Sequence, residues 1–513
     1  MERRGQWWAL AVLVLPVLLI SVDATVLGFA LPYLSEDLGP TGAEQLWIVD
    51  VYSFVLAGLL VFMGTLGDRI GRRRLLLAGA VAFGLASVLA AFATSSMMLI
   101  LARALLGVGG ATLMPSTLSL IRSIFTDDRR RRTAVGVWSA AFSGGMAVGP
   151  VVGGWLLEHF WWGSVFLINV PVMLVLLVAG PLLLPEHRDP NPGRFDFLSA
   201  LLSLGAMLPV VYGVKIAATS GFTWSAAVAI VVGLGLGVLF VRRQRRLERP
   251  MLDLALFSNR MFTASVVTNL LGVFALVGLL FLVPQYLQLV LGLSPITAAL
   301  WMLPATVAGI AGALLAVRLA RRVRVPVLVS VGLLLGAAGF LMLTAIGTTA
   351  GLAAVVVAFV LVGGGVALSE TLTNDLVISA APVDRAGAAS AISETGYELG
   401  GALGTALLGS LATAVYQSGL AGSLNAAPHD AAMDTAVAAA HDTLGGAVAA
   451  AGSLPAPAAE ALVTSAREAF VSGLHVTAWA GAAILVYTAV QAYFLLTRGR
   501  RRNSSSKEAP LPV

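Results

Sequence analysis

Two glutamates, Glu394 and Glu398, stand one helical turn apart in an apolar segment long enough to cross a membrane. Residues at i and i+4 share one face of a helix, so the two carboxylates should lie within reach of each other. An acidic side chain at membrane depth costs roughly 2.5–3.5 kcal/mol, and such residues commonly recognise cations or carry protons. Tyr397 stands beside them and offers a ring face to a cation, worth about 0.5–2 kcal/mol. We predict cation binding at these three residues and proton coupling at Glu394, with helix capping or contact with cytoplasmic water as the alternative for either acid.

Four further charged residues stand inside or near apolar runs. Asp23 lies near the middle of the first run, where it could couple protons, bind a cation or form a helix–helix hydrogen bond. Asp50 lies about one turn inside the outer edge of the second run, so a gating role and a proton role both stay open. Glu370 approaches a cytoplasmic end and is a minor candidate for gating or proton movement. Arg103 must be paired or solvated, because an isolated charge at this depth is costly.

The elements that position these residues are membrane-spanning helices. The chain has 513 residues, of which 58% are hydrophobic and 11% charged, against about 25% charged in soluble domains. Apolar runs of about 20 residues recur along the chain, and each can cross a hydrocarbon core about 30 Å thick. We predict fourteen spans, near residues 7–30, 46–66, 75–93, 97–121, 133–157, 162–183, 197–215, 223–241, 261–284, 297–317, 326–347, 351–376, 388–414 and 472–497.

Basic residues set the orientation of these spans. With the N-terminus inside, 29 of the 32 Lys and Arg residues fall on the cytoplasmic side. Cytoplasmic loops carry this excess in helical membrane proteins, so both termini are predicted in the cytoplasm. The net charge of +6 is explained by these loops and does not indicate nucleic-acid binding.

Several function classes are disfavoured by composition. The chain has no cysteine, which excludes disulfides, thiolate metal sites and cysteine nucleophiles. It has no phosphate-binding loop, and its five histidines are scattered, which argues against an enzyme, a metal centre or an ATP-driven pump. We therefore expect a gradient to supply the energy, with no cofactor.

A basic loop after the second span recurs after the tenth. Its motif residues are Gly64, Gly67, Asp68, Arg69, Gly71, Arg72 and Arg73. Aligning Arg69 with Arg318 also aligns the arginines three and four positions later. Internal repeats underlie alternating-access transporters, whose site lies near the midplane between the halves, although two unrelated basic loops are the alternative. We interpret the first copy as a cytoplasmic latch that stabilises one access state.

Glycines repeat every fourth residue in the fifth span, at Gly145, Gly149 and Gly153, with Pro150 and Gly154 beside them. Small residues at this spacing allow close helix packing, and proline removes a backbone donor and can kink a helix. We predict a bending or sealing element between the halves, with ordinary tight packing as the alternative.

Together these stretches resemble the major facilitator superfamily. The Asp68 loop is similar to its loop motif, the stretch after Arg103 to its arginine motif, and the glycine ridge to the motif of its drug antiporters. Segments around Asp23, Asn169 and Glu394 resemble the branch of 14-span drug:proton antiporters.

The sequence departs from that branch at two places. Ser393 stands where an acid is common, and no acid occurs between residues 297 and 317, where quaternary-ammonium exporters can carry an Asp.

The resemblance implies an all-α polytopic membrane protein of the major facilitator fold. Two six-helix bundles would occupy residues 1–183 and 261–497, with an inserted two-helix hairpin and its linkers at 184–260 and a cytoplasmic tail at 498–513. Independently of the resemblance, the alanine-rich external segment 415–470, with Pro455 and Pro457, is expected to be loop with short helices. The resemblance also implies export of lipophilic, mainly cationic compounds, such as quaternary ammonium ions and ethidium, in exchange for protons, with Arg103 taking part in proton coupling.

The expected setting is the bacterial cytoplasmic membrane, with the lipid bilayer, protons and small lipophilic cations as partners, no nucleic acid, and a monomer as the working unit. Two other functions stay open. One is a dedicated exporter of a single endogenous product, such as an antibiotic. The other is a membrane sensor or scaffold that transports nothing.

Overall fold

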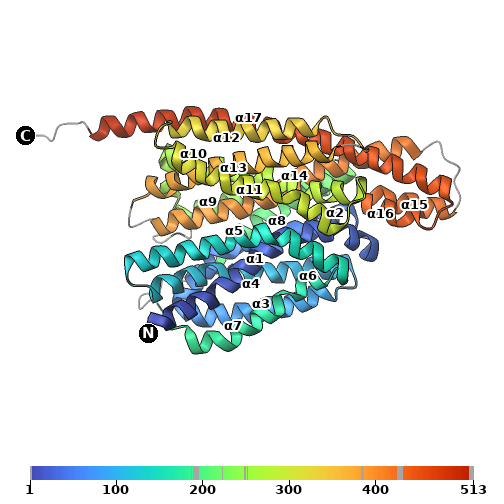
Figure 1. The fold of residues 1–513 in the computed structure, drawn as a ribbon. Helices are drawn as coiled ribbons and strands as arrows, with labels where there is room; N and C mark the ends of the chain where they lie inside the picture. The colour runs from blue at the N-terminus through green and yellow to red at the C-terminus, as the bar shows by residue number, and fades with distance from the viewer. Residues whose placement is uncertain are drawn as a thin grey trace, which may run out of the picture.

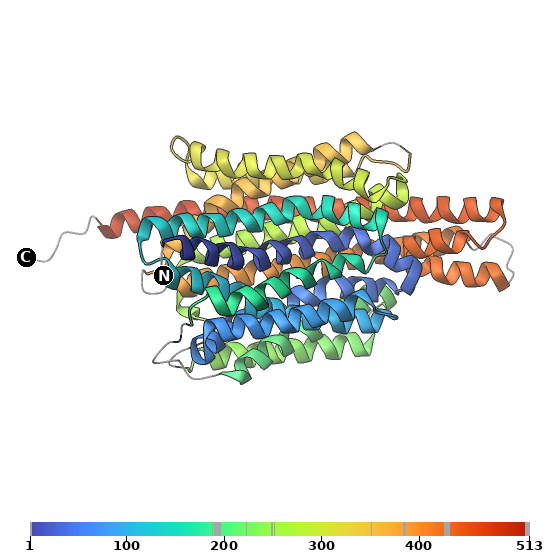
Figure 2. The same ribbon diagram turned by 60° about the horizontal axis from the view of Figure 1, so that its bottom comes forward.

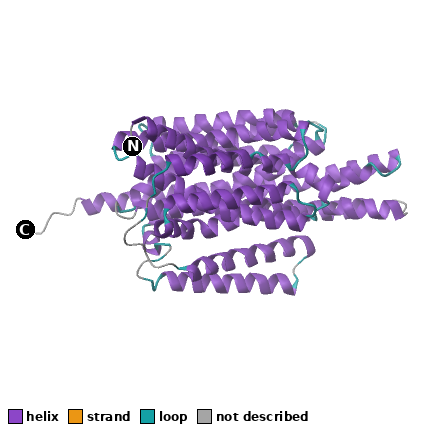
Figure 3. Cartoon of the chain, turned by 90° about the horizontal axis from the view of Figure 1, so that it is seen from below, coloured by secondary structure: helices purple, strands orange, loops and turns teal. Residues whose placement is uncertain are grey.

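The computed structural model describes residues 3–186, 188, 196–221, 223–247, 250, 252–349, 351–382, 386–424 and 431–507. Over these ranges the chain is built from helices joined by short loops, with no strand (Figure 3). The helices of the first part are α1 (Arg3–Leu38), α2 (Gly42–Ile70), α3 (Arg72–Ala91), α4 (Ser96–Ile124), α5 (Asp128–His159), α6 (Ser164–Leu167) and α7 (Asn169–Leu183). They are followed by α8 (Phe197–Ser220), α9 (Trp224–Gln244) and the short 3₁₀ helix η1 (Leu254–Ser258). The remaining elements are α10 (Arg260–Gln285), the π-turn η2 (Tyr286–Val290), α11 (Pro295–Leu319), α12 (Val325–Leu343), α13 (Leu352–Ala380), α14 (Ala386–Leu424), α15 (Ala431–Asp442), α16 (Leu444–Ala451) and α17 (Ala456–Lys507).

Fourteen helical segments in the described ranges are long and apolar enough to cross a membrane. This confirms the predicted number of spans and the all-helical fold. Two spans each join two elements, α6 with α7 and α10 with η2. The start of α1 and the end of α17 lie at the same end of the molecule (Figure 1), as an even number of spans requires.

Polar residues at the loop ends define where several spans begin. Thr41 caps α2 through a reciprocal capping box with Glu44, and Ser95 caps α4. Ser294 caps α11 directly before Pro295, a residue well suited to the first turn because its missing N–H would have no helical partner. Such caps satisfy backbone donors at the first turn, so the chain turns at these positions and the apolar spans that follow are held in register.

The helices pack as two sets and a hairpin. In the first set α1 packs on α5, α2 on α4 and α3 on both α4 and α7; in the second α10 packs on α14, α13 on α11 and α12, and α17 on α12 and α14. Helices α8 and α9 pack on each other, and α8 also contacts α2 of the first set and α14 of the second. The hairpin therefore lies against the boundary between the two sets.

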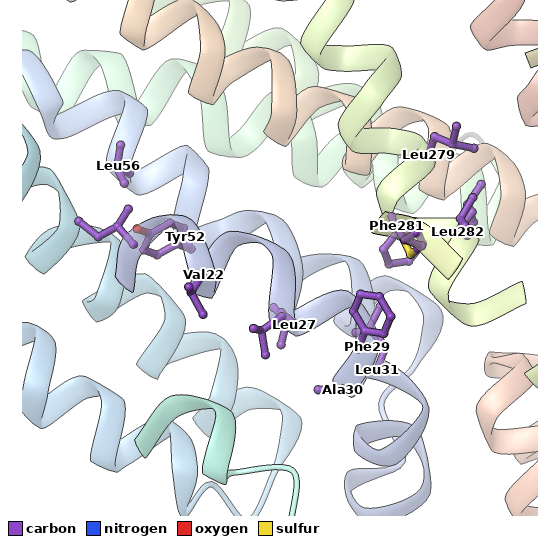
Figure 4. Close-up of a cluster of buried hydrophobic side chains, with 14 of the residues drawn as sticks. Val22, Leu27, Phe29, Ala30, Leu31, Tyr52, Leu56, Leu279, Phe281 and Leu282 are labelled. Carbon is purple, nitrogen blue, oxygen red and sulfur yellow. The ribbon is translucent and has the colours of Figure 1, made fainter. Parts of the chain in front are cut away.

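The two sets meet through α2 with α14, α5 with α11, and α1 with α10. Near the outer end, the Gln288 side chain donates to the Phe29 carbonyl at 3.3 Å. A Cβ added at Gly154 of α5 would lie 2.7 Å from the Cα of Ile296 at the start of α11. Figure 4 shows Phe29 of α1 beside Phe281 of α10 in the apolar cluster at this junction. These contacts close the space between the sets on the side opposite the termini.

The external segment, predicted as loop with short helices, contains two short helices and more helix than predicted. α14 continues to Leu424, α17 begins at Ala456, and α15 and α16 lie between them, projecting beyond the other helix ends (Figures 1 and 2). The Tyr416 hydroxyl donates to the Ala440 carbonyl at 2.6 Å and ties α14 to α15. The physical reason is composition, since alanine has the highest helix propensity of all residues. Residues 425–430 of this segment lie outside the described ranges.

Candidate functional site

Arg103 of α4 pairs with Asp23 of α1 inside the first helix set. Its Nη1 donates to Asp23 Oδ2 at 2.6 Å, and the side chains are 2% and 3% exposed. Its other nitrogens reach the backbone of α2, where Nε donates to the Ile48 carbonyl at 3.0 Å and Nη2 to the Val49 carbonyl at 3.4 Å. The guanidinium lies over the Tyr52 ring, 4.7 Å from its centroid. The pair therefore joins three helices, and its part in proton coupling stays a prediction.

A second buried ion pair joins the α8–α9 hairpin to the first helix set. Nζ of Lys215 in α8 lies 2.9 Å from both carboxylate oxygens of Asp50 in α2. The two side chains are 1% and 0% exposed. Nζ also lies 3.8 Å from the ring centroid of Trp47, one helical turn before Asp50. Asp50 is thus a paired anion. Sequence reasoning missed this pair, although Lys215 gave a signal as one of three basic residues outside the cytoplasmic loops.

The acids of α14 lie at the boundary between the two sets. The Ser53 side chain of α2 lies close to the Glu398 carboxylate, where α14 packs on the opposite helix set. Tyr52, next in sequence, interacts electrostatically with Glu398 as well as with the Asp23–Arg103 pair. Glu394 and Glu398 are both partly exposed residues, and they lie on the helix of the second set that packs on α2 of the first.

Tyr397 connects Glu370 to a polar network within the second set. Its hydroxyl accepts a hydrogen bond from the Asn374 amide at 3.0 Å and lies close to the Glu370 carboxylate. The Asn374 carbonyl oxygen accepts from Ser393 at 3.0 Å and from Asn269 at 3.1 Å. Within the described ranges, Glu370 Oε1 is buried without a hydrogen bond. The network brings Glu370 to the α14 site, and its two asparagines carried no sequence signal.

The residues of the basic loop motif form contacts on the cytoplasmic side of the first set. Asp68 forms an ion pair with Arg72 one turn later, while Arg69 is exposed. The backbone N–H of Arg73 donates to Glu186 after α7 at 3.1 Å. Gly71 has φ of +111° and lies against the same carboxylate, so a side chain there would be strained. These contacts tie α2, α3 and α7 together; the latch role stays a prediction.

The glycine ridge of α5 faces two neighbours. A Cβ added at Gly145, Gly149 or Gly153 would lie 1.9–2.9 Å from side chains of α1, so these three positions allow α1 and α5 to pack closely within one set. Gly154 instead faces α11 of the other set. Pro150 is buried within α5. Among the four glycines of the motif, Gly154 is thus the one placed against the other set, where the predicted sealing role would need a contact.

Taken together, the structure holds Asp23 and Arg103 in the first helix set and Glu370 with Tyr397 in the second. Glu394 and Glu398 lie on α14, which packs on α2, and Asp50 is held with the hairpin. Asp375, which follows Asn374 in α13, is exposed. In the part of the chain that the structure describes, no three His, Asp or Glu side chains are close enough to hold a metal ion. The arrangement can accept positive charge on carboxylates that lie between two helix sets.

Comparisons with known proteins agree with this architecture. The sequence model of the Major Facilitator Superfamily matches residues 13–405. The chain is 51% identical to the multidrug efflux pump LfrA of Mycolicibacterium smegmatis, over 94% of this chain and 95% of that protein. It is 38% identical to the methyl viologen resistance protein SmvA of Salmonella typhimurium, over 97% and 99%.

Among solved structures, a bacterial homologue of the human lysosomal transporter Spinster, in an inward-facing and unoccupied conformation, superposes with a TM-score of 0.63 at 15% identity. The superposition covers 96% of this chain and 99% of that one, and at this identity it shows a shared fold. With the family match, the two relatives and the fourteen spans, the chain belongs to the major facilitator superfamily and is a multi-pass transporter of the bacterial plasma membrane.

Proposed function

We propose that this transporter exports lipophilic, mainly cationic compounds, including quaternary ammonium ions and dyes such as ethidium, in exchange for protons. The observation that carries the proposal is the position of Glu394 and Glu398 on α14, where Glu398 meets Ser53 of the opposite helix set. A carboxylate there can hold a proton or a cationic substrate, and both helix sets can sense which one is bound. The names of the two relatives, which refer to multidrug efflux and to methyl viologen resistance, support cationic compounds as substrates.

The proposed cycle needs no ATP and no cofactor. Exchange of one proton for one monovalent cation moves no net charge, so the pH gradient alone would drive it, at about 1.36 kcal/mol per pH unit. A second proton per cycle would add the membrane potential, about 2.3 kcal/mol per 100 mV. We expect one chain to complete the cycle, because the acids, the tyrosine and the Asp23–Arg103 pair all come from a single protomer.

The test is ethidium efflux from preloaded cells, with and without a protonophore, for the wild type and the variants Glu394→Gln and Glu398→Gln. A charge-assisted contact contributes about 1.5–3 kcal/mol, so each variant should lose roughly ten-fold or more in efflux rate. Glu460→Gln is the matched control, because Glu460 is exposed at the outer end of α17 and far from α14's acids in sequence. Expression of all four proteins is compared in membrane fractions.

Protonophore-sensitive efflux that both α14 variants lose and the control keeps would support the proposal. Efflux that continues unchanged with the protonophore would contradict proton coupling. Efflux at the wild-type rate in both α14 variants would move cation binding away from α14.

A further inference from the structure

A cavity with mainly apolar walls lies where the α8–α9 hairpin meets the two helix sets. It is lined by Ala57 and Val61 of α2, Ala206 and Met207 of α8, Phe240 of α9 and Thr395 of α14. Its walls therefore come from both helix sets and from the hairpin, and none of the acids discussed above forms part of them.

The cavity adjoins the acid site. Ala57 follows Ser53 by four residues on α2, and Thr395 precedes Glu398 by three residues on α14. Residues at these spacings share a helix face, about one turn or 5 Å apart along the axis. Because α2 runs inward and α14 runs outward, Ala57 lies on the cytoplasmic side of Ser53 and Thr395 lies on the cytoplasmic side of Glu398. The cavity thus begins about one turn to the cytoplasmic side of Ser53 and Glu398.

The hairpin forms one side of this cavity. A Cβ added at Gly58 of α2 would lie 2.4 Å from a methyl carbon of Leu204, so α8 packs directly on α2 beside the cavity. Phe240 of α9 is only 9% exposed and contributes a further wall. On the other side, Ala402 of α14 and Val211 of α8 belong to one buried cluster, so α8 also packs on α14 towards the outer end.

We propose that this cavity is the subsite for the alkyl tail of a lipophilic cation whose charged head lies against the carboxylates of α14. This inference rests on the proposed function and adds to it a substrate class, single-tailed quaternary ammonium ions. The occupant follows from the neighbouring charge, because a cationic head suits Glu398 whereas the phosphate of a phospholipid would be repelled by it. Mainly apolar walls one turn from that charge match an amphiphile with its head and tail joined end to end.

The experiment measures Kd values of the purified full-length protein for alkyltrimethylammonium ions from butyl to decyl, at free concentrations fixed by dialysis. Tetraphenylphosphonium, a lipophilic cation without a tail, is measured in parallel. Ala57→Leu fills the cavity and Met207→Ala enlarges it. Gly235→Leu is the matched control, because nothing lies within 4 Å of an added Cβ at this position of α9. Glu398→Gln is measured as well, and bound phospholipid is quantified by native mass spectrometry.

In the wild type, each methylene that enters the cavity should strengthen binding about four-fold. Ala57→Leu should stop this gain two or three methylenes earlier, which weakens decyl binding roughly ten- to sixty-fold while tetraphenylphosphonium is unaffected. Met207→Ala should extend the gain to longer tails, a result that a folding defect could not produce. The Gly235→Leu series should follow the wild type.

The same chain-length profile in the wild type, Ala57→Leu and Met207→Ala would overturn the tail subsite. So would loss of a bound phospholipid from Ala57→Leu without any change in that profile, since the occupant would then be a lipid. Equal weakening of tetraphenylphosphonium and every alkyl ion would also overturn it, because the cavity would then act only through the acid site. If tetraphenylphosphonium binding depends on Glu398 while the profile ignores the cavity, the tail subsite fails and the proposed function stands. If Glu398→Gln changes no binding at all, both fail.

Discussion

Removing Lys215 should destabilise the whole transporter, and removing Asp50 with it should restore much of the loss. The two side chains are 1% and 0% exposed, so Lys215→Met leaves a carboxylate buried without its cation. Asp50→Asn takes away the carboxylate charge that faces the Lys215 ammonium and leaves an amide oxygen in its place. In the double variant neither charge is present, and an apolar side chain of similar length faces an amide.

The size of the effect follows from the geometry. At 2.9 Å and an effective dielectric constant of about 20, the attraction between the charges is roughly 6 kcal/mol before desolvation is subtracted. Breaking a buried pair from one side costs about 3–5 kcal/mol, whereas replacing both partners is often neutral or better. With an unfolding entropy of about 2.1 cal/mol/K per residue over 513 residues, 1 kcal/mol corresponds to roughly 1 °C. The single variants should therefore melt about 3–5 °C lower.

The assay is thermal unfolding of the purified proteins in one detergent at one scan rate, because unfolding of a large membrane protein is often irreversible. The four proteins form a double-mutant cycle, in which coupling is the difference between the double variant and the sum of the singles. A melting temperature of Lys215→Met equal to that of the wild type would refute the reasoning, as would strictly additive losses in the double variant.

Two further changes test local packing and charge. Gly145→Ala should destabilise the folded protein by about 1–3 kcal/mol, because its Cβ would lie 2.5 Å from the Leu18 carbonyl oxygen. The neighbouring Gly144 has open space around an added Cβ, so the control Gly144→Ala should melt at or above the wild-type temperature. Equal losses in both variants would contradict the close packing of the glycine ridge on α1. At the start of α8, burial acts to raise the pKa of Asp196, but hydrogen bonds, led by the one from Arg243 at 2.8 Å, lower it below its ordinary value. The stabilisation is thus present above the ordinary carboxyl pKa of about 3.9 and is lost as pH falls through the lower folded value. Asp196→Asn should therefore lower the free energy of unfolding by about 1 kcal/mol at pH 7, seen as a lower melting temperature, and by progressively less in acid. A difference in melting temperature that does not depend on pH would rule out the charge as its cause.

Much of the fold was predictable because lipid imposes one dominant requirement on sequence. Each span must be helical and apolar over about 20 residues, and basic residues mark the cytoplasmic loops. The ends of the spans were less predictable, since a helix can continue beyond the apolar run that identifies it. α14 extends to Leu424 and α17 begins at Ala456, both through alanine-rich sequence that hydropathy assigns to loop.

The site was predictable in its members but not in its pairings. Helical spacing alone placed Glu394 and Glu398 on one face, and the cost of burying charge required a partner for Arg103. No pattern in the sequence could tell that Lys215, 165 residues away, lies against Asp50, because this pairing depends on where the hairpin packs. Asn374 was equally hidden, since a single asparagine near a helix end is common and its three partners come from three different positions along the chain.

The pairing across the hairpin boundary also bears on how such transporters can evolve and be recombined. A two-helix segment that made only apolar contacts could be exchanged between relatives, or deleted, without leaving a charged residue of another helix unpaired. Here the segment supplies the counter-charge of a helix in the first set, so a chimera that takes α8 from a homologue without a lysine at this place inherits an orphan carboxylate. Substitutions at positions 50 and 215 should therefore occur together across homologues. A transplanted hairpin should function only when the matching α2, with its residue at position 50, is transplanted too.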